Sequence, residues 1–441
     1  MYRIGEFILV QQKQKRSRGL VFTDQGLKKL QSKMKSYENR EKSGKKFTFE
    51  ELSEITGLAY NTVFKVLKRK KGVDKRTLAK FFLVFDLELS SDDYTLSGLR
   101  SSHSCKPNVE WENLSNTFDA SKFYGRTTEL TAIKQWLVED CCRLVTVYGM
   151  GGIGKTALSV KLVKEIEDKF ERVLWISLQK SPLLGQVLTD LIQFLFDEYK
   201  SKIIRSNSIQ ADLTELFNYL RLHRCLIVFD ELETIMQIGV FSGHYKDSHQ
   251  NYGQLIRYMA EISHKSGFLL ISRELPKEAS IFDGGNLPIR NIELNSLQQI
   301  EGLNFFQNSN FSGSISLKNK LIENYFGNPF ALIKVARKIE AIYGGSIHQF
   351  FQADEPLCSD IKNLLNQHYQ RLSGLENKIC RKLITYTDPI TLSRLQKDFA
   401  PSTPHIEVMM SVESLLRRSL IIMRKQFFEL NPLFGKICNF N

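Results

Sequence analysis

Residues 149–156 read Gly149-Met150-Gly151-Gly152-Ile153-Gly154-Lys155-Thr156, which matches the pattern G-x-x-x-x-G-K-T. Glycines in such a loop adopt positive φ, so that backbone N–H groups surround phosphates, while Lys155 reaches the β- and γ-phosphates and the Thr156 hydroxyl binds Mg²⁺. A β-rich run at 143–148 precedes the loop, and the helix expected after it carries apolar residues at i+4 spacing, namely Leu158, Leu162, Ile166 and Phe170. The positive end of that helix would face an anion. The pattern predicts a nucleotide site, with a decayed, empty loop as the alternative.

A second apolar run, 225–229, ends in Asp230 and Glu231. Such a run predicts a buried parallel strand next to the loop's strand, with Asp230 as a Mg²⁺ partner and Glu231 as a base for hydrolysis. The run 268–272 ends in Arg273, which we expect at the γ-phosphate, although a surface arginine is the alternative. With the runs 172–178 and 289–294, these segments predict five strands in a doubly wound α/β sheet that binds ligands at the strand C-termini.

The first quarter of the chain carries most of the excess positive charge. Residues 1–100 contain 22 Lys and Arg against 12 Asp and Glu, a net charge of +10, whereas all 441 residues reach +13. This imbalance favours an anionic partner, nucleic acid first, over the alternative of a solvated basic face.

The same region has the layout of an all-helical helix-turn-helix domain. A polar helix is expected at 24–46, a short helix begins with a capping box of Thr48 and Glu51, and Gly57 ends that helix. A recognition helix at 60–71 and a closing helix at 75–87 follow. If the unit docks on DNA, Asn61, Thr62 and Lys65 reach base edges, while phosphates are neutralised by Lys68, Arg69, Lys70 and Lys71. The alternative is a protein–protein adaptor. The segment resembles the repressor-like domain of bacterial regulators.

Composition limits the class of protein further. The chain is 42% hydrophobic and 25% charged, and no apolar run approaches the roughly 18 to 20 residues that span a bilayer. Its seven cysteines are an odd number and form no C-x-x-C pair, which favours inert thiols in a reducing compartment over a metal site. We therefore expect a cytoplasmic, multidomain α/β protein without membrane contact.

From about residue 122 the chain resembles NB-ARC proteins, the STAND class of signal-transducing ATPases. The motifs that carry the resemblance are Phe123–Leu130, the loop 149–156, and the stretches 170–178, 226–231, 270–274 and 327–332. The resemblance implies a P-loop domain at 122–295, a helical subdomain at 296–366 and a winged helix at 367–441, behind a helix-turn-helix domain at 1–94 and a linker at 95–121. An N-terminal unit fused to this module is similar to the arrangement of cyanobacterial members.

The resemblance also implies ligands and roles. It implies ATP or ADP with Mg²⁺, slow regulatory hydrolysis and a homo-oligomer on activation. Residues implied to hold the nucleotide are Gly125, Arg126, Gly149, Gly151, Gly152, Ile153, Gly154, Lys155, Thr156, Ala157 and Pro329. The first two lie near the base and ribose in the family, and the proline packs by the adenine.

The chain departs from the family pattern in two places. Where members carry a Met-His-Asp-like trio that holds ADP, it has Leu430-Asn431-Pro432, so we expect an amide donor from Asn431 in place of the histidine. Members also commonly continue into repeats that sense a signal, and none is visible here. We expect sensing to lie elsewhere, to be done by a partner or to have been cut away. A DNA-binding regulator tuned by nucleotide and a motor-type ATPase are the competing functions.

Overall fold

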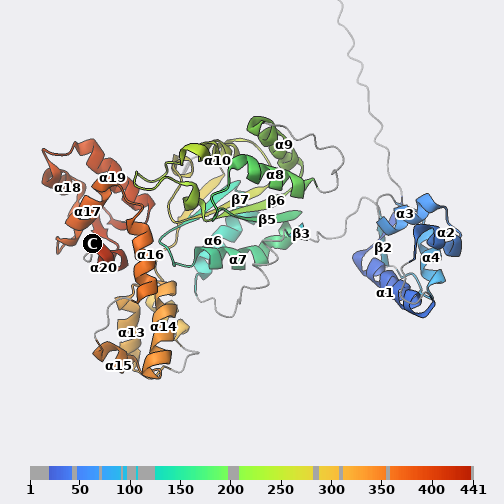
Figure 1. Cartoon of the computed structure of the whole chain (residues 1–441), viewed down its shortest axis with the longest axis horizontal. Helices are drawn as coiled ribbons and strands as arrows, with labels where there is room; N and C mark the ends of the chain where they lie inside the picture. The colour runs from blue at the N-terminus through green and yellow to red at the C-terminus, as the bar shows by residue number, and fades with distance from the viewer. Residues whose placement is uncertain are drawn as a thin grey trace, which may run out of the picture. The chain divides into compact units, whose positions relative to one another are not determined.

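The computed structural model describes residues 19–41, 47–68, 72–90, 93–96, 106–107, 125–196, 208–281, 288–306, 311–353 and 358–438. The chain divides into two compact units, residues 1–103 and 104–441 (Figure 1). None of the helices in these ranges combines the length and the apolar character needed to cross a membrane.

The N-terminal unit packs helices around aromatic side chains. Its helices are α1 (Asp24–Glu41), α2 (Phe49–Thr56), α3 (Tyr60–Lys68) and α4 (Lys75–Val84). The capping box of Thr48 and Glu51 is confirmed, and Gly57 ends α2 in the left-handed conformation at φ 62°. The core consists of Phe22, Leu30, Leu52, Val63, Val66, Leu78, Phe81, Phe82 and Phe85. These side chains fix the angle between α2 and α3.

The expectation of an all-helical N-terminal unit is wrong in one respect. Strands β1 (Leu20–Phe22) and β2 (Tyr94–Leu96) pair antiparallel and join the two ends of the unit. Strands of three residues are too short to show a clear alternation of apolar and polar side chains, so the sequence pattern did not reveal them. Strand β2 also extends into the stretch expected to begin the linker at residue 95.

The second unit is built on a parallel sheet. Its strands are β4 (Leu144–Tyr148), β5 (Arg172–Ser177), β6 (Cys225–Asp230), β7 (Gly267–Ser272) and β8 (Ile289–Glu293). In the described part of the chain a sixth strand, β3 (Lys106–Pro107), pairs with β5, and the order is β3-β5-β6-β7-β4-β8. Two prediction details are therefore wrong: β3 lies in the expected linker, and β7 separates β6 from the loop's strand β4.

Helices cover both faces of the sheet, as a doubly wound fold requires. One face packs on α6 (Thr127–Lys134) and α7 (Lys155–Ile166), and the other packs on α8 (Leu184–Leu195), α9 (Ile209–Leu222) and α10 (Asn251–Glu261) (Figure 1). Side chains alternate accordingly along each strand, because successive residues point to opposite faces. In β6, Leu226 and Val228 face α6 and α7, whereas Ile227 and Phe229 face α8 to α10.

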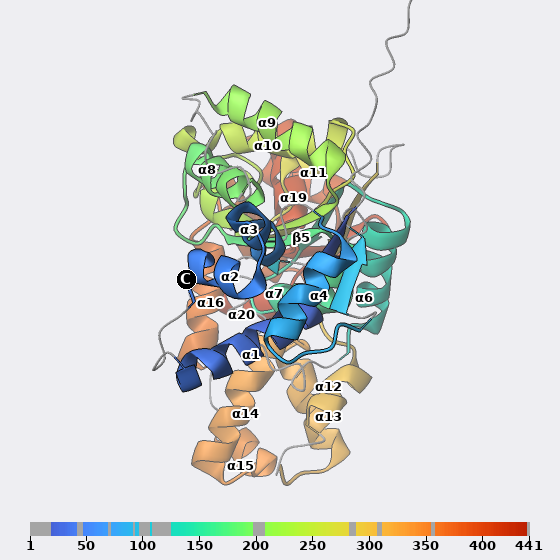
Figure 2. The same cartoon turned by 90° about the vertical axis from the view of Figure 1, so that its right-hand side faces the viewer.

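Helices dominate the rest of this unit. The short α11 (Lys277–Ile281) precedes β8, and then come α12 (Gln299–Phe305), α13 (Ile315–Asn324), α14 (Pro329–Tyr343), α15 (Ile347–Gln352) and α16 (Ser359–Tyr369). The C-terminal part contains α17 (Gly374–Ile384), α18 (Leu392–Phe399), α19 (His405–Arg417) and α20 (Pro432–Cys438). It also holds an antiparallel sheet of β10 (Ile421–Arg424), β11 (Phe427–Leu430) and β9 (Ile390–Thr391). These helices form two groups, α12 to α16 and the C-terminal α17 to α20. One apolar core runs through both helical groups, and α16 extends from the first group to the second (Figures 1 and 2).

Candidate functional site

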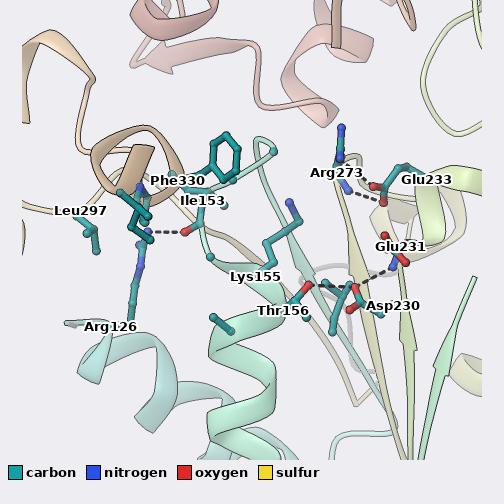
Figure 3. Close-up of a pocket in the computed structure, with 17 residues that line it drawn as sticks. Arg126, Ile153, Lys155, Thr156, Asp230, Glu231, Glu233, Arg273, Leu297 and Phe330 are labelled. Carbon is teal, nitrogen blue, oxygen red and sulfur yellow. Dashed lines mark hydrogen bonds and ion pairs between the residues drawn. The ribbon is translucent and has the colours of Figure 1, made fainter. Parts of the chain in front are cut away.

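A cavity of about 390 Å³ opens where β4, β6 and β7 end. In a parallel α/β sheet this is the edge at which ligands bind. In Figure 3, Arg126, Leu297 and Phe330 form one end, while Thr156, Asp230 and Arg273 form the other and Lys155 lies between them. The lining residues are Arg126, Gly151, Gly152, Ile153, Gly154, Lys155, Thr156, Ala157, Asp230, Glu231, Glu233, Ile271, Arg273, Leu297, Pro329, Phe330 and Ile333.

The glycine-rich loop has the backbone that a phosphate site requires. Gly152 and Gly154 adopt φ values of 75° and 97°, a region that side chains with a Cβ atom enter only under strain. Helix α7 begins directly afterwards, at Lys155. The N–H groups in the first turn of a helix have no partner within the helix, and the helix dipole adds positive potential there. This end of the cavity therefore suits an anion.

Lys155 is buried beneath the loop. Its Nζ donates hydrogen bonds to the carbonyl oxygens of Gly149, at 2.8 Å, and Met150, at 3.1 Å. Burial lowers the pKa of Lys155 to about 8, and the nearby carboxylates of Glu233 and Asp230 oppose this shift. The side chain is still a cation at neutral pH, in a place where little water weakens its attraction for a phosphate.

Thr156 and Asp230 bring two oxygen ligands together at the sheet edge. The Thr156 hydroxyl lies 3.4 Å from Asp230 Oδ1. Burial raises the pKa of Asp230 to about 7, so its carboxylate is easily protonated in the absence of a cation. Within the described ranges no three His, Cys, Asp or Glu side chains are grouped to hold a metal ion. A hydroxyl and a single carboxylate fit Mg²⁺, which takes a few protein oxygens and completes its shell with water and phosphate.

Glu231 follows Asp230 in a left-handed conformation, at φ 62°. This backbone turns the chain out of β6 and into the short helical turn Leu232–Ile235. The Glu231 carboxylate accepts a hydrogen bond from the Ser177 hydroxyl at 2.8 Å and lines the cavity. It therefore lies beside Asp230, the residue predicted to bind Mg²⁺, and its own role as a base for water stays a prediction.

Arg273 reaches the same end of the cavity from β7. Its Nε lies 3.0 Å from Glu233 Oε1, and its backbone N–H donates to Glu233 Oε2 at 3.1 Å. Its Nη1 donates to Gln367 Oε1 in α16 at 2.8 Å. The guanidinium is thereby oriented by partners on two separate elements. Arg273 thus lines the cavity, and its contact with a γ-phosphate stays a prediction.

Arg126 defines the opposite end. It is buried, and its Nη2 donates to the carbonyl oxygens of Ile153 at 3.3 Å and Asn295 at 2.5 Å. Its backbone N–H donates to Glu301 Oε1 of α12 at 2.8 Å. Gly125 is not among the residues that line the cavity; it turns the chain at φ 68°, and a Cβ atom there would lie 2.3 Å from Glu301 Oε1. Gly125 and Arg126 thus hold the N-terminal end of α6 against the phosphate loop and α12.

The loop is also held by residues far along the chain. Asn328 Nδ2 donates to the Gly151 carbonyl oxygen at 3.2 Å, and Phe330 N–H donates to that of Gly152 at 3.1 Å. The Gly151 N–H donates to His368 Nε2 in α16 at 2.8 Å. The phosphate loop is consequently in direct contact with the start of α14 and with the last turn of α16.

The structure does not place every predicted residue in the cavity. Gly149 turns the chain under Leu294, whose carbonyl oxygen would lie 2.7 Å from a Cβ atom. Asn431 Oδ1 instead accepts hydrogen bonds from the N–H groups of Leu433, at 3.1 Å, and Phe434, at 3.4 Å, which caps α20. It is not a lining residue of this cavity. Asn328 and His368 are the residues of the C-terminal half whose side chains are seen to bond to Gly151 of the loop.

Sequence reasoning missed several residues of this site. They are Glu233, Ile271, Leu297, Phe330, Ile333 and His368. Ile271 precedes Ser272 and Arg273 in the predicted strand, and Phe330 follows Pro329, so proximity to a predicted residue was a usable signal for these two. His368 has no such neighbour in the sequence.

The proposed DNA-contacting residues lie on α3 of the N-terminal unit. Asn61 and Lys65 are exposed and Thr62 is partly exposed, while Val63 and Val66 face the core. The side chain of Lys68 and the whole of Arg69, Lys70 and Lys71 lie outside the described residues.

A buried group of charges joins β7 to the C-terminal helices. Glu274, next to Arg273, pairs with Arg371, and its Oε2 lies 3.2 Å from Arg418 Nη1 without hydrogen-bond alignment. Arg418 Nε donates to Glu376 Oε1 at 3.2 Å. Glu274, Glu376 and Arg418 are 1%, 0% and 2% exposed. Buried charges are tolerated only in such pairs, so this group ties α17 and α19 to the sheet edge beside the cavity.

Comparison with known proteins agrees with this site. Residues 126–250 match the family model described as the NB-ARC domain. Residues 126–250 are thus an NB-ARC domain with a P-loop. The NB-ARC match covers α6, the phosphate loop and β6, so it includes Arg126, Lys155, Thr156 and Asp230.

Relatives share parts of the chain. An uncharacterized WD repeat-containing protein of Nostoc sp. is 39% identical over 335 residues, which are 73% of this chain and 26% of that protein. A putative disease resistance protein of Arabidopsis thaliana is 30% identical over 116 residues, 25% of this chain and 13% of that protein. The chain thus spans about a quarter or less of these relatives' length. The Walker-type ATPase of Pyrococcus abyssi shows the same fold, with a TM-score of 0.51 and 14% identity over 73% of this chain and 97% of that chain.

Proposed function

We propose that this nucleotide-dependent signalling NTPase is an ATP/ADP-operated switch whose nucleotide state sets the position of its C-terminal helices. One observation carries the proposal: the phosphate loop and α14 line a single cavity, and the loop is bonded to Asn328 and His368. A ligand in this cavity would contact both the phosphate loop and α14. If the hydrogen bonds from the loop to Asn328 and His368 broke, the loop and these helices would be able to move separately. Nucleotide binding and domain arrangement are therefore linked.

The roles of the residues follow from their positions. Adenine would lie at the end formed by Arg126, Leu297 and Pro329, and the phosphates would lie over the start of α7. Mg²⁺, held by Thr156 and Asp230, supplies neutralisation of phosphate charge. Glu231 would take the proton of an attacking water in slow, regulatory hydrolysis.

The energy that such a switch needs is within reach of these groups. Moving a two-state equilibrium from 1:99 to 99:1 takes about 5.5 kcal/mol of differential binding. A hydrogen bond to a charged group contributes about 1.5 to 3 kcal/mol. Contacts of a γ-phosphate with Lys155 and Arg273, together with Mg²⁺, would supply that amount.

Lys155→Ala tests the proposal. We expect the variant to lose nucleotide binding in calorimetry and to lose any change of oligomer size on adding ATP. Lys169→Ala is a matched control, because Lys169 lies beyond the far end of α7, is exposed and pairs with Asp168. If Lys155→Ala keeps both properties, the chain is not operated by nucleotide at this site.

We propose domain boundaries and partners that accord with this function. The domains are a helix-turn-helix unit at 1–94, a linker at 95–121, the P-loop domain at 122–295, a helical subdomain at 296–366 and a winged helix at 367–441. The hairpin of β10 and β11 has the form of a wing. We further propose a cytoplasmic protein that forms a homo-oligomer on activation and responds to a separate sensor.

A second candidate function is a DNA-binding regulator whose assembly is tuned by nucleotide. The net charge of +10 over residues 1–100 and the exposed Asn61 and Lys65 favour it. Binding of the full chain to duplex DNA should then weaken steeply with salt, and Asn61→Ala should reduce the preference for one sequence over another. Asn39→Ala, an exposed change on α1, is the control. Equal binding to all duplexes, or none, indicates a protein adaptor.

A further inference from the structure

The last turn of α16 contacts two donors at the phosphate end of the cavity. His368 Nε2 accepts a hydrogen bond from the Gly151 N–H at 2.8 Å. The preceding residue, Gln367, accepts one from Arg273 Nη1 through its Oε1, also at 2.8 Å. Two consecutive residues of one helix thus occupy a backbone donor of the phosphate loop and the arginine of β7.

His368 is suited to accept rather than donate at this place. It is 3% exposed, and it faces cations from each element around it: Arg273 after β7, Lys155 of α7, Arg371 after α16 and Arg418 after α19. Burial first, and then these cations, hold the pKa of His368 well below its usual range. The ring is therefore neutral, and because Nε2 accepts, Nδ1 carries the proton.

There is no spare room between α16 and the loop. A Cβ atom on Gly151 would lie 2.7 Å from His368 Nε2 and 2.8 Å from Leu364 Cδ1 of the same helix. A phosphate oxygen that approaches the Gly151 N–H must therefore displace the imidazole. By contrast, among the described residues neither His368 nor Gln367 forms a hydrogen bond with the first turn of α7, where the donors for a second phosphate lie.

We propose that Gln367 and His368 form a diphosphate-selecting element. They occupy the Gly151 N–H and Arg273, two donors that a third phosphate group requires, and leave the start of α7 available to a nucleoside diphosphate. A triphosphate binds only when α16 moves off the loop. The number of phosphate groups on the nucleotide is therefore coupled to the position of α16, the helix that links the two helical groups. This inference rests on the proposed nucleotide function and names its regulation.

The test measures the affinities of the full chain for ADP and for a non-hydrolysable ATP analogue, with Mg²⁺, by calorimetry. His368→Ala should raise the affinity for the triphosphate relative to the diphosphate by about fivefold to tenfold, since one competing hydrogen bond is removed. His368→Gln retains an acceptor near the Nε2 position and should restore the preference for the diphosphate. This rescue separates the accepting atom from mere bulk.

Gln367→Ala provides a variant that keeps the fold, because the Gln367 side chain is exposed. It should shift the ratio of affinities in the same direction by about twofold to fivefold, through release of Arg273. Gln370→Ala, an exposed change one turn onward, is the control and should leave the ratio unchanged.

The outcomes distinguish a failure of this inference from a failure of the proposed nucleotide function. An unchanged ratio in both His368→Ala and Gln367→Ala would overturn the inference and leave nucleotide binding intact. An equal loss of both affinities in His368→Ala would also overturn it, because the histidine would then only support the shape of the loop. If the parent chain binds neither nucleotide, the proposed function itself fails.

Discussion

Replacing Arg418 by methionine removes a cation that lies beside two buried carboxylates and one backbone carbonyl oxygen. Its Nη1 lies 3.2 Å from Glu274 Oε2, its Nε donates to Glu376 Oε1 at 3.2 Å, and its Nη2 donates to the Val240 carbonyl oxygen at 2.7 Å. The side chain is 3% exposed. Methionine retains most of the apolar volume of the arginine stem, so the change tests charge and hydrogen bonding more than packing.

The magnitude follows from what each acceptor keeps. Removing one partner of a buried ion pair costs about 3 to 5 kcal/mol, because the remaining charge is left without compensation. Here Glu376 retains hydrogen bonds from the Ser414 hydroxyl at 2.6 Å and the Ser373 N–H at 2.7 Å, and Glu274 retains Arg371. We therefore expect a loss of about 3 kcal/mol in the free energy of unfolding.

The neighbouring Arg417→Met is the matched control. Arg417 pairs with Glu413 at 2.6 Å, one helical turn away, and its partner is largely exposed. A pair of this kind contributes about 0.3 to 0.5 kcal/mol. Urea unfolding of the full chain, followed by tryptophan fluorescence and by tryptic cleavage of the C-terminal part, measures both variants.

A double variant sharpens the test. Glu376→Gln keeps the carbonyl oxygen that caps α17 through Ser373 but removes the unpaired charge. In the Arg418→Met background it should recover about 1 to 2 kcal/mol. If Arg418→Met and Arg417→Met lose the same stability to within about 0.5 kcal/mol, or if the double variant is weaker still, the buried charges do not hold α17 and α19 to the sheet edge.

Three further outcomes follow from the site. Because the folded pKa of Lys155 is about 8, below its ordinary 10.5, the unfolded chain binds more protons between these values, so stability should rise with pH from 8 to 10; Lys155→Met should lack this rise in thermal melts. Since Asp230 has a pKa of about 7, Mg²⁺-dependent nucleotide affinity should fall as pH drops below 7, by up to roughly tenfold per pH unit, and Asp230→Asn should show weak binding without this slope. Gly151→Ala should lower stability by about 1 to 3 kcal/mol, measured by urea unfolding, because its Cβ atom would clash with His368 and Leu364; a fully stable variant would contradict the close packing of α16.

The parts of the site that could be predicted are local. The phosphate loop, the strand before it and the helix after it are adjacent in sequence, so apolar periodicity and the glycine positions were enough to place Lys155 and Thr156. Asp230 and Arg273 could be predicted because each ends an apolar run, and parallel strands bring their carboxyl ends to one edge. The strand order could not be predicted from these runs, since any of them fits any interior position.

What the sequence determined by itself is therefore the phosphate loop: Gly149 to Thr156 are consecutive residues, and the backbone conformation and charge that they provide are local properties. What only the tertiary structure decided is which distant groups close that site. His368 lies 217 residues from Gly151, and its role depends on a buried, cation-rich surrounding that no residue near it in the chain reveals. Asn431, which the resemblance placed at ADP, caps α20 instead, because its amide oxygen lies within hydrogen-bonding distance of the first N–H groups of that helix.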